Sequence, residues 1–196
     1  MGEITLVIGG ARSGKSVFAE ELLQSAEKVC YIATNALPQD AEMQQRIKLH
    51  QARRSSQWQT HEGFLNLAEF ISEEQRHSNY LLDCGTMLTT NYFFHLMSER
   101  YGTDYQVIDQ EIAKFSQAEK AAIEQEILVE WTKIITAIKT SASDVVIVTN
   151  EVGLGIVPED AFTRWFRDIY GRVNQYLGKE ATAVQLVVAG IAVKIK

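Results

Sequence analysis

The sequence predicts an α/β fold in which helices flank a mainly parallel sheet. Five short apolar runs, rich in β-branched residues, alternate along the chain with segments of helical periodicity. The apolarity of each run is continuous, which is typical of strands buried on both faces, and strands that alternate with helices indicate parallel pairing. In such a sheet, ligands bind beyond the carboxyl ends of the strands. The expected strands are ITLVI (4–8), VCYIA (29–33), YLLDC (80–84), VVIVT (145–149) and VQLVVAG (184–190).

Segments with a helical spacing of apolar residues separate these strands. The long charged stretch 103–140 has isoleucines at helical intervals and predicts two helices or one broken helix. The amphipathic segment 159–178 should pack on the core, with Gly178 as its stop. Asp40 is expected to cap a helix that runs to about Arg53. The remaining expected helices are 15–26 and one marked by Phe64, Leu67, Ala68 and Ile71.

Length, charge and cysteine usage limit the classes of protein. A chain of 196 residues favours a single domain, 1–196, with a sizeable core. A net charge of −6 provides no basic field for nucleic acid, and no apolar run approaches the roughly 20 residues that a membrane anchor requires. Cys30 and Cys84 both lie in apolar runs, which favours buried, inert thiols in a reducing cytoplasm. The N-terminus also lacks the features of a signal peptide.

The first expected strand leads into a phosphate-binding motif. The segment GGARSGKS fits the pattern G-x-x-x-x-G-K-[ST] between a strand and a helix. Glycines let successive N–H groups point at phosphate oxygens, and the following helix adds its positive end. Lys15 is expected to reach the β and γ phosphates of a nucleoside triphosphate, and Ser16 to hold Mg²⁺. The loop residues are Gly9, Gly10, Ala11, Arg12, Ser13, Gly14, Lys15 and Ser16.

Asp83 is the expected second ligand of this metal. It ends the apolar strand YLLD, and a carboxylate at that place resembles the acidic Mg²⁺ ligand of P-loop proteins. The alternative is an ordinary surface carboxylate at a strand end. The loop and the carboxylate together imply a nucleoside triphosphate and Mg²⁺ but no particular reaction, because kinases, switches and motors share them.

The segment RIKLHQARR places His50 among cations. Arg46, His50 and Arg53 occupy positions i, i+4 and i+7 of the expected helix, with Arg54 beside them. Nearby positive charge disfavours an imidazolium, and a neutral imidazole is a nucleophile that forms covalent intermediates. The arginines could also neutralise an attacked phosphate. The cluster therefore fits a histidine that attacks an α-phosphorus and carries a nucleotidyl group. Spacing alone favours the alternative, a half-exposed helix with solvated arginines.

A set of motifs occurs in order along the chain: GGARSGKS, YIAT, RIKLHQARR, W-x-T-x-E (58–62), LLDC, VTNEVGLGIVP and VAGIAVKIK. Together they closely resemble the bifunctional adenosylcobinamide kinase / adenosylcobinamide-phosphate guanylyltransferase family of cobalamin biosynthesis. The resemblance runs from residue 4 to the end and is weakest between about 98 and 140. It implies a P-loop NTPase-like (RecA-like) fold and an enzyme that phosphorylates adenosylcobinamide with ATP or GTP. GTP then guanylylates a histidine, and the phosphorylated corrinoid takes the GMP to give adenosylcobinamide-GDP.

The resemblance also assigns residues to the site. The active histidine of the family lies in R-I-x-x-H, which here ends at His50, and Leu49 stands where some relatives carry a second histidine. Glu62 is a suitable partner for the donors of guanine, N1–H and N2–H₂. Asn150 and Glu151 follow the carboxyl end of a strand, and Glu151 could be a metal-side acid, contact the corrinoid or simply hold the loop. The nucleotide-lining residues implied beyond the phosphate loop are Ala33, Thr34, Asn35, Gln51, Ala52, Arg53, Arg54, Glu62 and Asp83.

The resemblance further implies a homo-oligomer, with a trimer as one expected state, and adenosylcobinamide and its phosphate as binding partners. On the residues alone, two other classes of protein stay open. One is a different P-loop small-molecule kinase that leaves His50 idle, and the other is a nucleotide-dependent switch without turnover of a third substrate.

Overall fold

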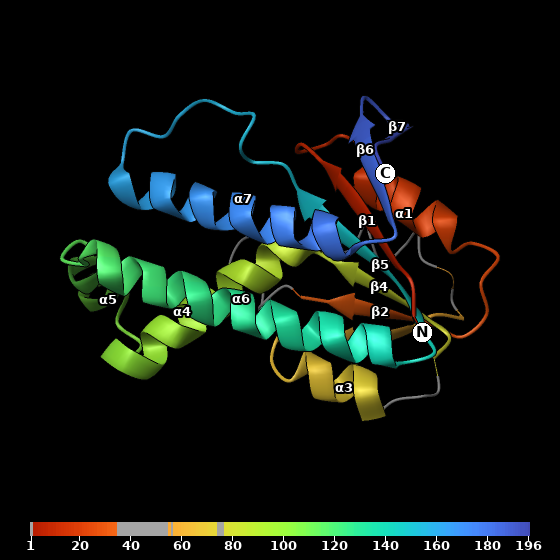
Figure 1. The fold of residues 1–196 in the computed structure, drawn as a ribbon, viewed down its shortest axis with the longest axis horizontal. Helices are drawn as coiled ribbons and strands as arrows, with labels where there is room; N and C mark the ends of the chain where they lie inside the picture. The colour runs from red at the N-terminus through yellow and green to blue at the C-terminus, as the bar shows by residue number, and fades with distance from the viewer. Residues whose placement is uncertain (1, 35–54, 56, 74–76) are drawn as a thin grey trace.

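A single seven-stranded sheet forms the centre of the molecule in the computed structural model, which describes residues 2–34, 55, 57–73 and 77–196. The strand order is β3-β2-β4-β5-β1-β6-β7. All neighbours pair in parallel except β6 and β7, which are antiparallel. The expected α/β fold with a mainly parallel sheet is therefore confirmed (Figure 1). The strands are β1 Ile4–Gly9, β2 Val29–Ala33, β3 Gln59–Glu62, β4 Asn79–Asp83, β5 Asp144–Asn150, β6 Ala183–Val188 and β7 Ile191–Lys194.

Helices cover both faces of this sheet, because successive strand residues point to opposite sides. Leu6 belongs to the larger core cluster and its neighbour Val7 to the smaller one. Helix α1 packs on the smaller cluster through Ala19, whereas the other described helices build the larger cluster. The helices are α1 Lys15–Leu22, α3 Leu67–Glu73, α4 Gly85–Tyr101, α5 Tyr105–Ile112, α6 Gln117–Thr140 and α7 Ala161–Glu180.

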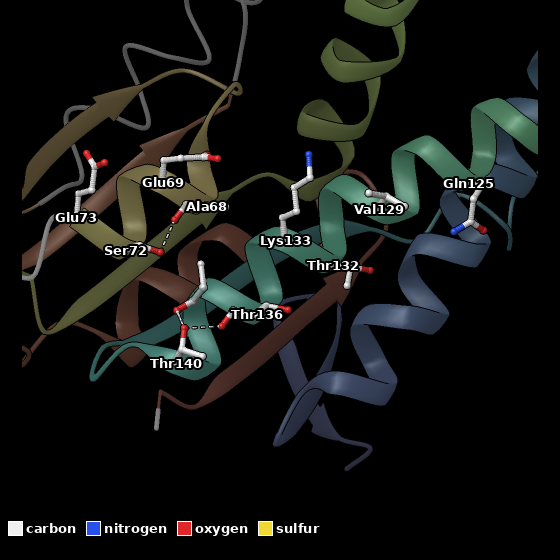
Figure 2. A pocket seen from close by; sticks show the side chains of 11 residues that line it. Ala68, Glu69, Ser72, Glu73, Gln125, Val129, Thr132, Lys133, Thr136 and Thr140 are labelled. Carbon is white, nitrogen blue, oxygen red and sulfur yellow. Dashed lines mark hydrogen bonds between the residues drawn. The ribbon is translucent and has the colours of Figure 1, made fainter.

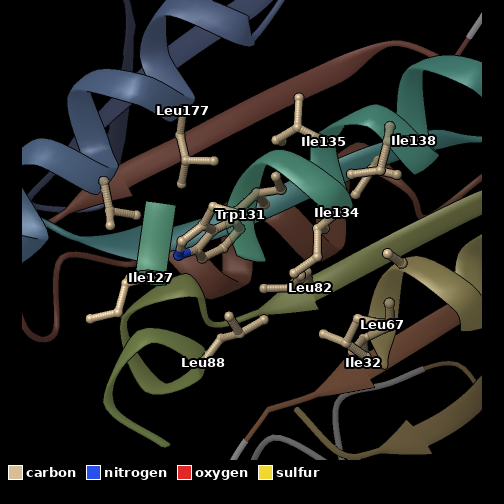
Figure 3. Packing of buried hydrophobic residues seen from close by; sticks show 14 of the residues in the cluster. Ile32, Leu67, Leu82, Leu88, Ile127, Trp131, Ile134, Ile135, Ile138 and Leu177 are labelled. Atoms are coloured by element: carbon tan, nitrogen blue, oxygen red, sulfur yellow. The ribbon is translucent and has the colours of Figure 1, made fainter. Parts of the chain in front are cut away.

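Helix α6 supplies the centre of the larger core. Figure 3 shows Trp131 and Ile134 of this helix above Leu82 of β4, with α3, α4 and α7 packed around them. Trp131 is fully buried, and its indole Nε1 donates a hydrogen bond to Oγ1 of Thr89 in α4 at 3.0 Å. Because a buried indole N–H needs a partner, this bond fixes α6 against the start of α4.

The five expected strands are all present, and two further strands lie at the edges of the sheet. Strand β3 is largely exposed and reads Gln-Thr-His-Glu, so it lacks the apolar signal of a buried strand. Strand β7 follows β6 after a turn at Ala189 and Gly190, which both have positive φ. That backbone shape suits a two-residue hairpin, so the run expected at 184–190 ends in a turn instead of continuing as a strand.

Most expected helices are confirmed, with corrections at their ends. The stretch 103–140 forms two helices, α5 and α6, so the first of the two alternatives is confirmed and the single broken helix is not formed. Gly178 does not stop α7, which continues to Glu180. A glycine inside a helix costs only about 1 kcal/mol, and burial of the adjacent Leu177 offsets that cost. Helix α1 ends at Leu22, earlier than expected, because the next amides, of Leu23 and Gln24, donate three residues back instead of four and so form turns.

Helix α4 was not among the expected helices. It gave no clear periodic signal, because threonines and glycine share its buried positions with Leu88, Phe93 and Met97. The helix expected between Asp40 and Arg53 lies outside the described residues. Within the described residues, no helix is both long and apolar enough to cross a membrane.

Candidate nucleotide site

The carboxyl ends of the parallel strands bring several of the expected site residues to one edge. Ala33, which ends β2, is in register with Glu62 of β3 on one side and with Asp83 of β4 on the other. Gly9, which ends β1, is in register with Asn150 of β5. Residues from distant parts of the chain therefore meet along one edge of the sheet, where α/β folds bind ligands.

The phosphate loop connects β1 to α1 with the shape that its glycines allow. Gly14, at the N-cap of α1, has φ 93°, and Arg12 has φ 57°. The Ser13 N–H donates to the Gly10 carbonyl at 3.3 Å, which closes the loop on itself. The amides at the start of α1 face the space beyond the strand ends, where orphan N–H groups and the helix dipole favour an anion.

Close packing at Gly9 explains why the loop begins with a residue that has no side chain. A Cβ at this position would lie 2.5 Å from the carbonyl oxygen of Val187 and 2.6 Å from Oγ of Ser13. The first contact is with backbone of the neighbouring strand, so it cannot be relieved by a side-chain rotation. Gly9 thus lets β1, β6 and the loop approach each other closely.

Lys15 lies across the loop, close to the strand that ends in Asp83. Its Nζ donates to the Gly10 carbonyl at 3.1 Å. Burial lowers the pKa of Lys15, and electrostatic interactions with Cys84, once ionised, and with Asp83 oppose that effect. The effect of the Asp83 carboxylate means that its charge lies near enough to act on the lysine.

Asp83 is held by Tyr31, a residue of the YIAT motif for which the sequence predicted no role. The hydroxyl of Tyr31 donates to Oδ2 of Asp83 at 2.8 Å, and Tyr31 is only 3% exposed. Ser16 and Asp83 together offer a hydroxyl and a carboxylate oxygen, which are the hard ligands that Mg²⁺ prefers. The donor chemistry of these two residues therefore fits the metal.

Thr34 joins the ends of β2 and β4 rather than presenting its hydroxyl to solvent. The residue is fully buried, and its Oγ1 donates to the Cys84 carbonyl and accepts from the Cys84 N–H, both at 2.8 Å. Its own carbonyl accepts from Nδ2 of Asn91 at 2.6 Å. Burial raises the pKa of Cys84 to about 11, and the Asp83 carboxylate adds to the rise. The thiol is thus protonated at neutral pH.

A polar network ties the end of β5 to two helices. Thr86 of α4 accepts from the Asn150 N–H at 2.8 Å, and Asn174 of α7 donates to the Asn150 carbonyl at 3.0 Å. The hydroxyl of Thr149 connects Thr86 and Asn174, because it forms a hydrogen bond with each of these two side chains. Sequence reasoning missed Thr86 and Asn174, although Asn174 lies at i+4 from the buried Tyr170 and so shares its face of the amphipathic helix.

Glu151 turns its carboxylate back onto its own loop. Its backbone N–H donates to the Gly9 carbonyl at 3.0 Å, and its Oε1 accepts from the Gly153 N–H at 2.6 Å. Of the three roles considered for this residue, these contacts favour the one that holds the loop. They also join the β5–α7 connection to the start of the phosphate loop.

Comparison with known proteins decides between the classes of P-loop protein. A family model described as "Cobinamide kinase / cobinamide phosphate guanyltransferase" matches residues 5–195. The chain belongs to this family. It is 43% identical over 192 residues to the bifunctional adenosylcobalamin biosynthesis protein CobU of Escherichia coli, covering 97% of this chain and 98% of the relative. It is 44% identical to CobU of Salmonella typhimurium with the same coverage, and 35% identical to CobP of Pseudomonas aeruginosa over 97% and 96% of the two chains.

Membership in the cobinamide kinase / guanyltransferase family confirms the resemblance that the motifs indicated, and it makes the chain an enzyme with a P-loop-like α/β fold. Several residues assigned to the site on that resemblance lie outside the described residues. They are Asn35, His50, Gln51, Ala52, Arg53 and Arg54. Glu62, by contrast, is described and exposed at the end of β3.

An open groove of about 710 Å³ lies elsewhere, between α3 and α6 (Figure 2). Its walls include Ser72 and Glu73 of α3 and Thr132, Lys133 and Thr140 of α6. Among the described residues, none of those expected in the nucleotide site of this kinase and guanyltransferase family lines it. The groove is on the outer surface of the helical layer, away from the phosphate loop.

Proposed function

We propose that this chain phosphorylates adenosylcobinamide with ATP or GTP and then transfers GMP from GTP to the product through a guanylylated histidine, His50. The products are adenosylcobinamide-GDP and pyrophosphate. The observation that carries the proposal is the placement of a complete phosphate loop, Lys15 and Asp83 at one edge of the sheet in a chain that matches the family along almost its whole length.

In the kinase step, the loop amides and Lys15 bind the phosphates of the donor. Lys15 already lies over the loop, so it needs only to exchange the Gly10 carbonyl for a phosphate oxygen. A hydroxyl oxygen of adenosylcobinamide attacks the γ-phosphorus and the bond from that phosphorus to the bridging oxygen breaks. The nucleoside diphosphate leaves, and the hydroxyl proton is released to solvent. Ser16 and Asp83 would hold Mg²⁺, which neutralises the charge on the phosphates.

In the guanylyl step, a ring nitrogen of neutral His50 attacks the α-phosphorus of GTP. The new N–P bond forms as pyrophosphate leaves. A phosphate oxygen of adenosylcobinamide phosphate then attacks the same phosphorus, and the imidazole leaves in its neutral form. The arginines near His50 in the sequence would stabilise the charge on the phosphate oxygens in both halves.

The covalent intermediate provides the test. Incubation with Mg²⁺ and α-³²P-GTP, followed by denaturation, should leave an acid-labile and base-stable label on the protein. His50→Ala should abolish the label, whereas His95→Ala, at a half-buried position of α4, should keep it. An unlabelled wild type would indicate a simple kinase or a switch, and a label that survives in His50→Ala would move the nucleophile to another residue.

We further propose a homo-oligomer, such as a trimer, in the cytoplasm. The β6–β7 hairpin supports the oligomer, because Val188, Ile191, Val193 and Ile195 are all more than half exposed and an exposed apolar patch indicates an interface. Cys30 and Cys84 are thiols rather than halves of a disulfide, which suits a reducing compartment. Sedimentation equilibrium measures the oligomeric state, and a monomer at all concentrations would refute the oligomer. Cell fractionation tests the cytoplasmic location.

A further inference from the structure

The turn between β6 and β7 touches the phosphate loop, although it lies more than 170 residues further along the chain. We propose that this turn, Ala189–Gly190, is a positioning element that holds the loop in its phosphate-binding shape. The inference rests on the proposed function only in taking the loop as the triphosphate site. It gives a role to the closing motif VAGIAVKIK, which the chemistry leaves unexplained.

Two contacts join the turn to the loop. The Gly190 N–H donates to the Ser13 carbonyl at 2.8 Å. A Cβ placed on Gly14 would lie 3.1 Å from the Gly190 Cα, so the two backbones pack against each other with no room for a side chain between them. Ser13 is itself buried. The turn thus meets the loop at its sharpest bend, between Arg12 and Gly14.

The shape of the turn makes the Gly190 N–H available for this bond. Val188 and Ile191 are paired across the hairpin, so Ala189 and Gly190 are the two central residues of its turn. In such a turn the closing hydrogen bond joins the outer residues, and the N–H of the second central residue is left for another acceptor. Positive φ at both residues, 53° and 80°, is required for that geometry.

The bond to the Ser13 carbonyl also orients the next amide of the loop. A trans peptide is planar, with its C=O and N–H pointing in opposite directions. When the Ser13 carbonyl is held toward the turn, the Gly14 N–H must therefore point away from it, on the side open to a phosphate. A reversed peptide would instead present a carbonyl oxygen to the phosphate, which is repulsive. The turn therefore selects the orientation that binds an anion.

A matched pair of glycines separates this role from general stability. Gly190 has φ +80° and Gly102, at the end of α4, has φ +81°, and a Cβ added at either glycine would meet no heavy atom within 4 Å. Valine is strained at either position, because a β-branched residue disfavours positive φ. The strain at Gly102 is at least as large, because its ψ of −178° lies in a region that only glycine readily adopts. Only the change at Gly190, however, disturbs the phosphate loop.

The experiment measures binding of a fluorescent GTP analogue, mant-GTP, to the full-length variants with Mg²⁺. Gly190→Val should raise the Kd about tenfold or more, and it should raise KM for GTP with kcat within about threefold, since roughly one well-made contact is lost. Gly102→Val should bind like the wild type despite a loss of thermal stability at least as large as that in Gly190→Val. Gly190→Asn, which tolerates positive φ, should restore most of the affinity.

Wild-type affinity in Gly190→Val, or an equal loss in Gly102→Val, would overturn the proposal. If Gly190→Val does not fold, Gly190→Ala gives the same comparison against Gly102→Ala. Lys15→Ala keeps the test separate from the proposed function. Unchanged mant-GTP binding in Lys15→Ala would refute the phosphate loop as the site, whereas weakened binding there together with normal binding in Gly190→Val would refute the positioning role alone.

Discussion

At the scale of single residues, the contact between Tyr31 and Asp83 provides a test of the proposed metal role of Asp83. A hydrogen bond to a charged group contributes about 1.5–3 kcal/mol, and phenylalanine keeps the ring packing while it removes the bond. Tyr31→Phe should therefore lower the free energy of unfolding by about that amount and raise the Mg²⁺ concentration for half-maximal activity several-fold. Urea unfolding and a Mg²⁺ titration measure the two effects. Tyr105→Phe, on an exposed ring, is the control, and an unchanged Mg²⁺ midpoint in Tyr31→Phe would count against the metal role.

Cys84 should be a poor nucleophile, because burial and the neighbouring Asp83 carboxylate both raise the pKa of its thiol. A pKa raised from 9.0 to about 11 lowers the thiolate fraction at pH 8 about a hundredfold, and the thiolate is the reactive form. Alkylation of the native chain by iodoacetamide should thus be about a hundredfold slower than that of the urea-unfolded chain, and its rate should rise with pH up to about 11. Rapid alkylation of native Cys84 at pH 8 would contradict this picture.

The individual residues that the sequence could predict are those whose chemistry is local. Lys15 and Ser16 are set by the loop pattern, and Asp83 by its position at the end of an apolar strand. Tyr31 and Asn174 could not be predicted as partners, because their hydrogen bonds depend on strand register and helix placement. No spacing along the chain encodes such contacts.

At the scale of the elements, α6 should be the most sensitive to truncation of its buried face. Trp131→Ala removes a fully buried indole and its bond to Thr89, so it should cost about 3–5 kcal/mol of unfolding free energy. Val129→Ala, on the exposed side of the same helix, should change it by less than about 0.5 kcal/mol. Urea unfolding monitored by circular dichroism compares the two, and similar losses would mean that α6 is not anchored through Trp131.

Elements were predictable where burial leaves a continuous or periodic apolar signal. The five central strands have it, and β3 and β7 do not, because an edge strand is partly solvated. Helix α4 is surrounded on several sides, so its apolar residues do not form one stripe. At Gly178 the error was of the opposite kind. The glycine was a strong local signal for a helix end, but packing of the helix outweighed it and α7 continues.

At the scale of the whole molecule, the parallel sheet gathers the chemistry at one edge. The alternation of strands and helices was enough to predict that convergence, because parallel strands have their carboxyl ends together. The order in which the strands lie side by side in the sheet was not predictable. It places the strand of Asp83 two positions from the strand of the phosphate loop, with β5 between them, and brings the β6–β7 turn against the loop.

The central claim is that this edge binds the triphosphate and presents it to His50. A crystal structure with Mg²⁺ and a non-hydrolysable GTP analogue tests it most directly. We predict that the phosphates accept hydrogen bonds from the amides of residues 10–16, that Lys15 Nζ has moved from the Gly10 carbonyl to a phosphate oxygen, and that His50 approaches the α-phosphorus. An analogue bound in the groove between α3 and α6, or a histidine that lies far from that phosphorus, would contradict the account.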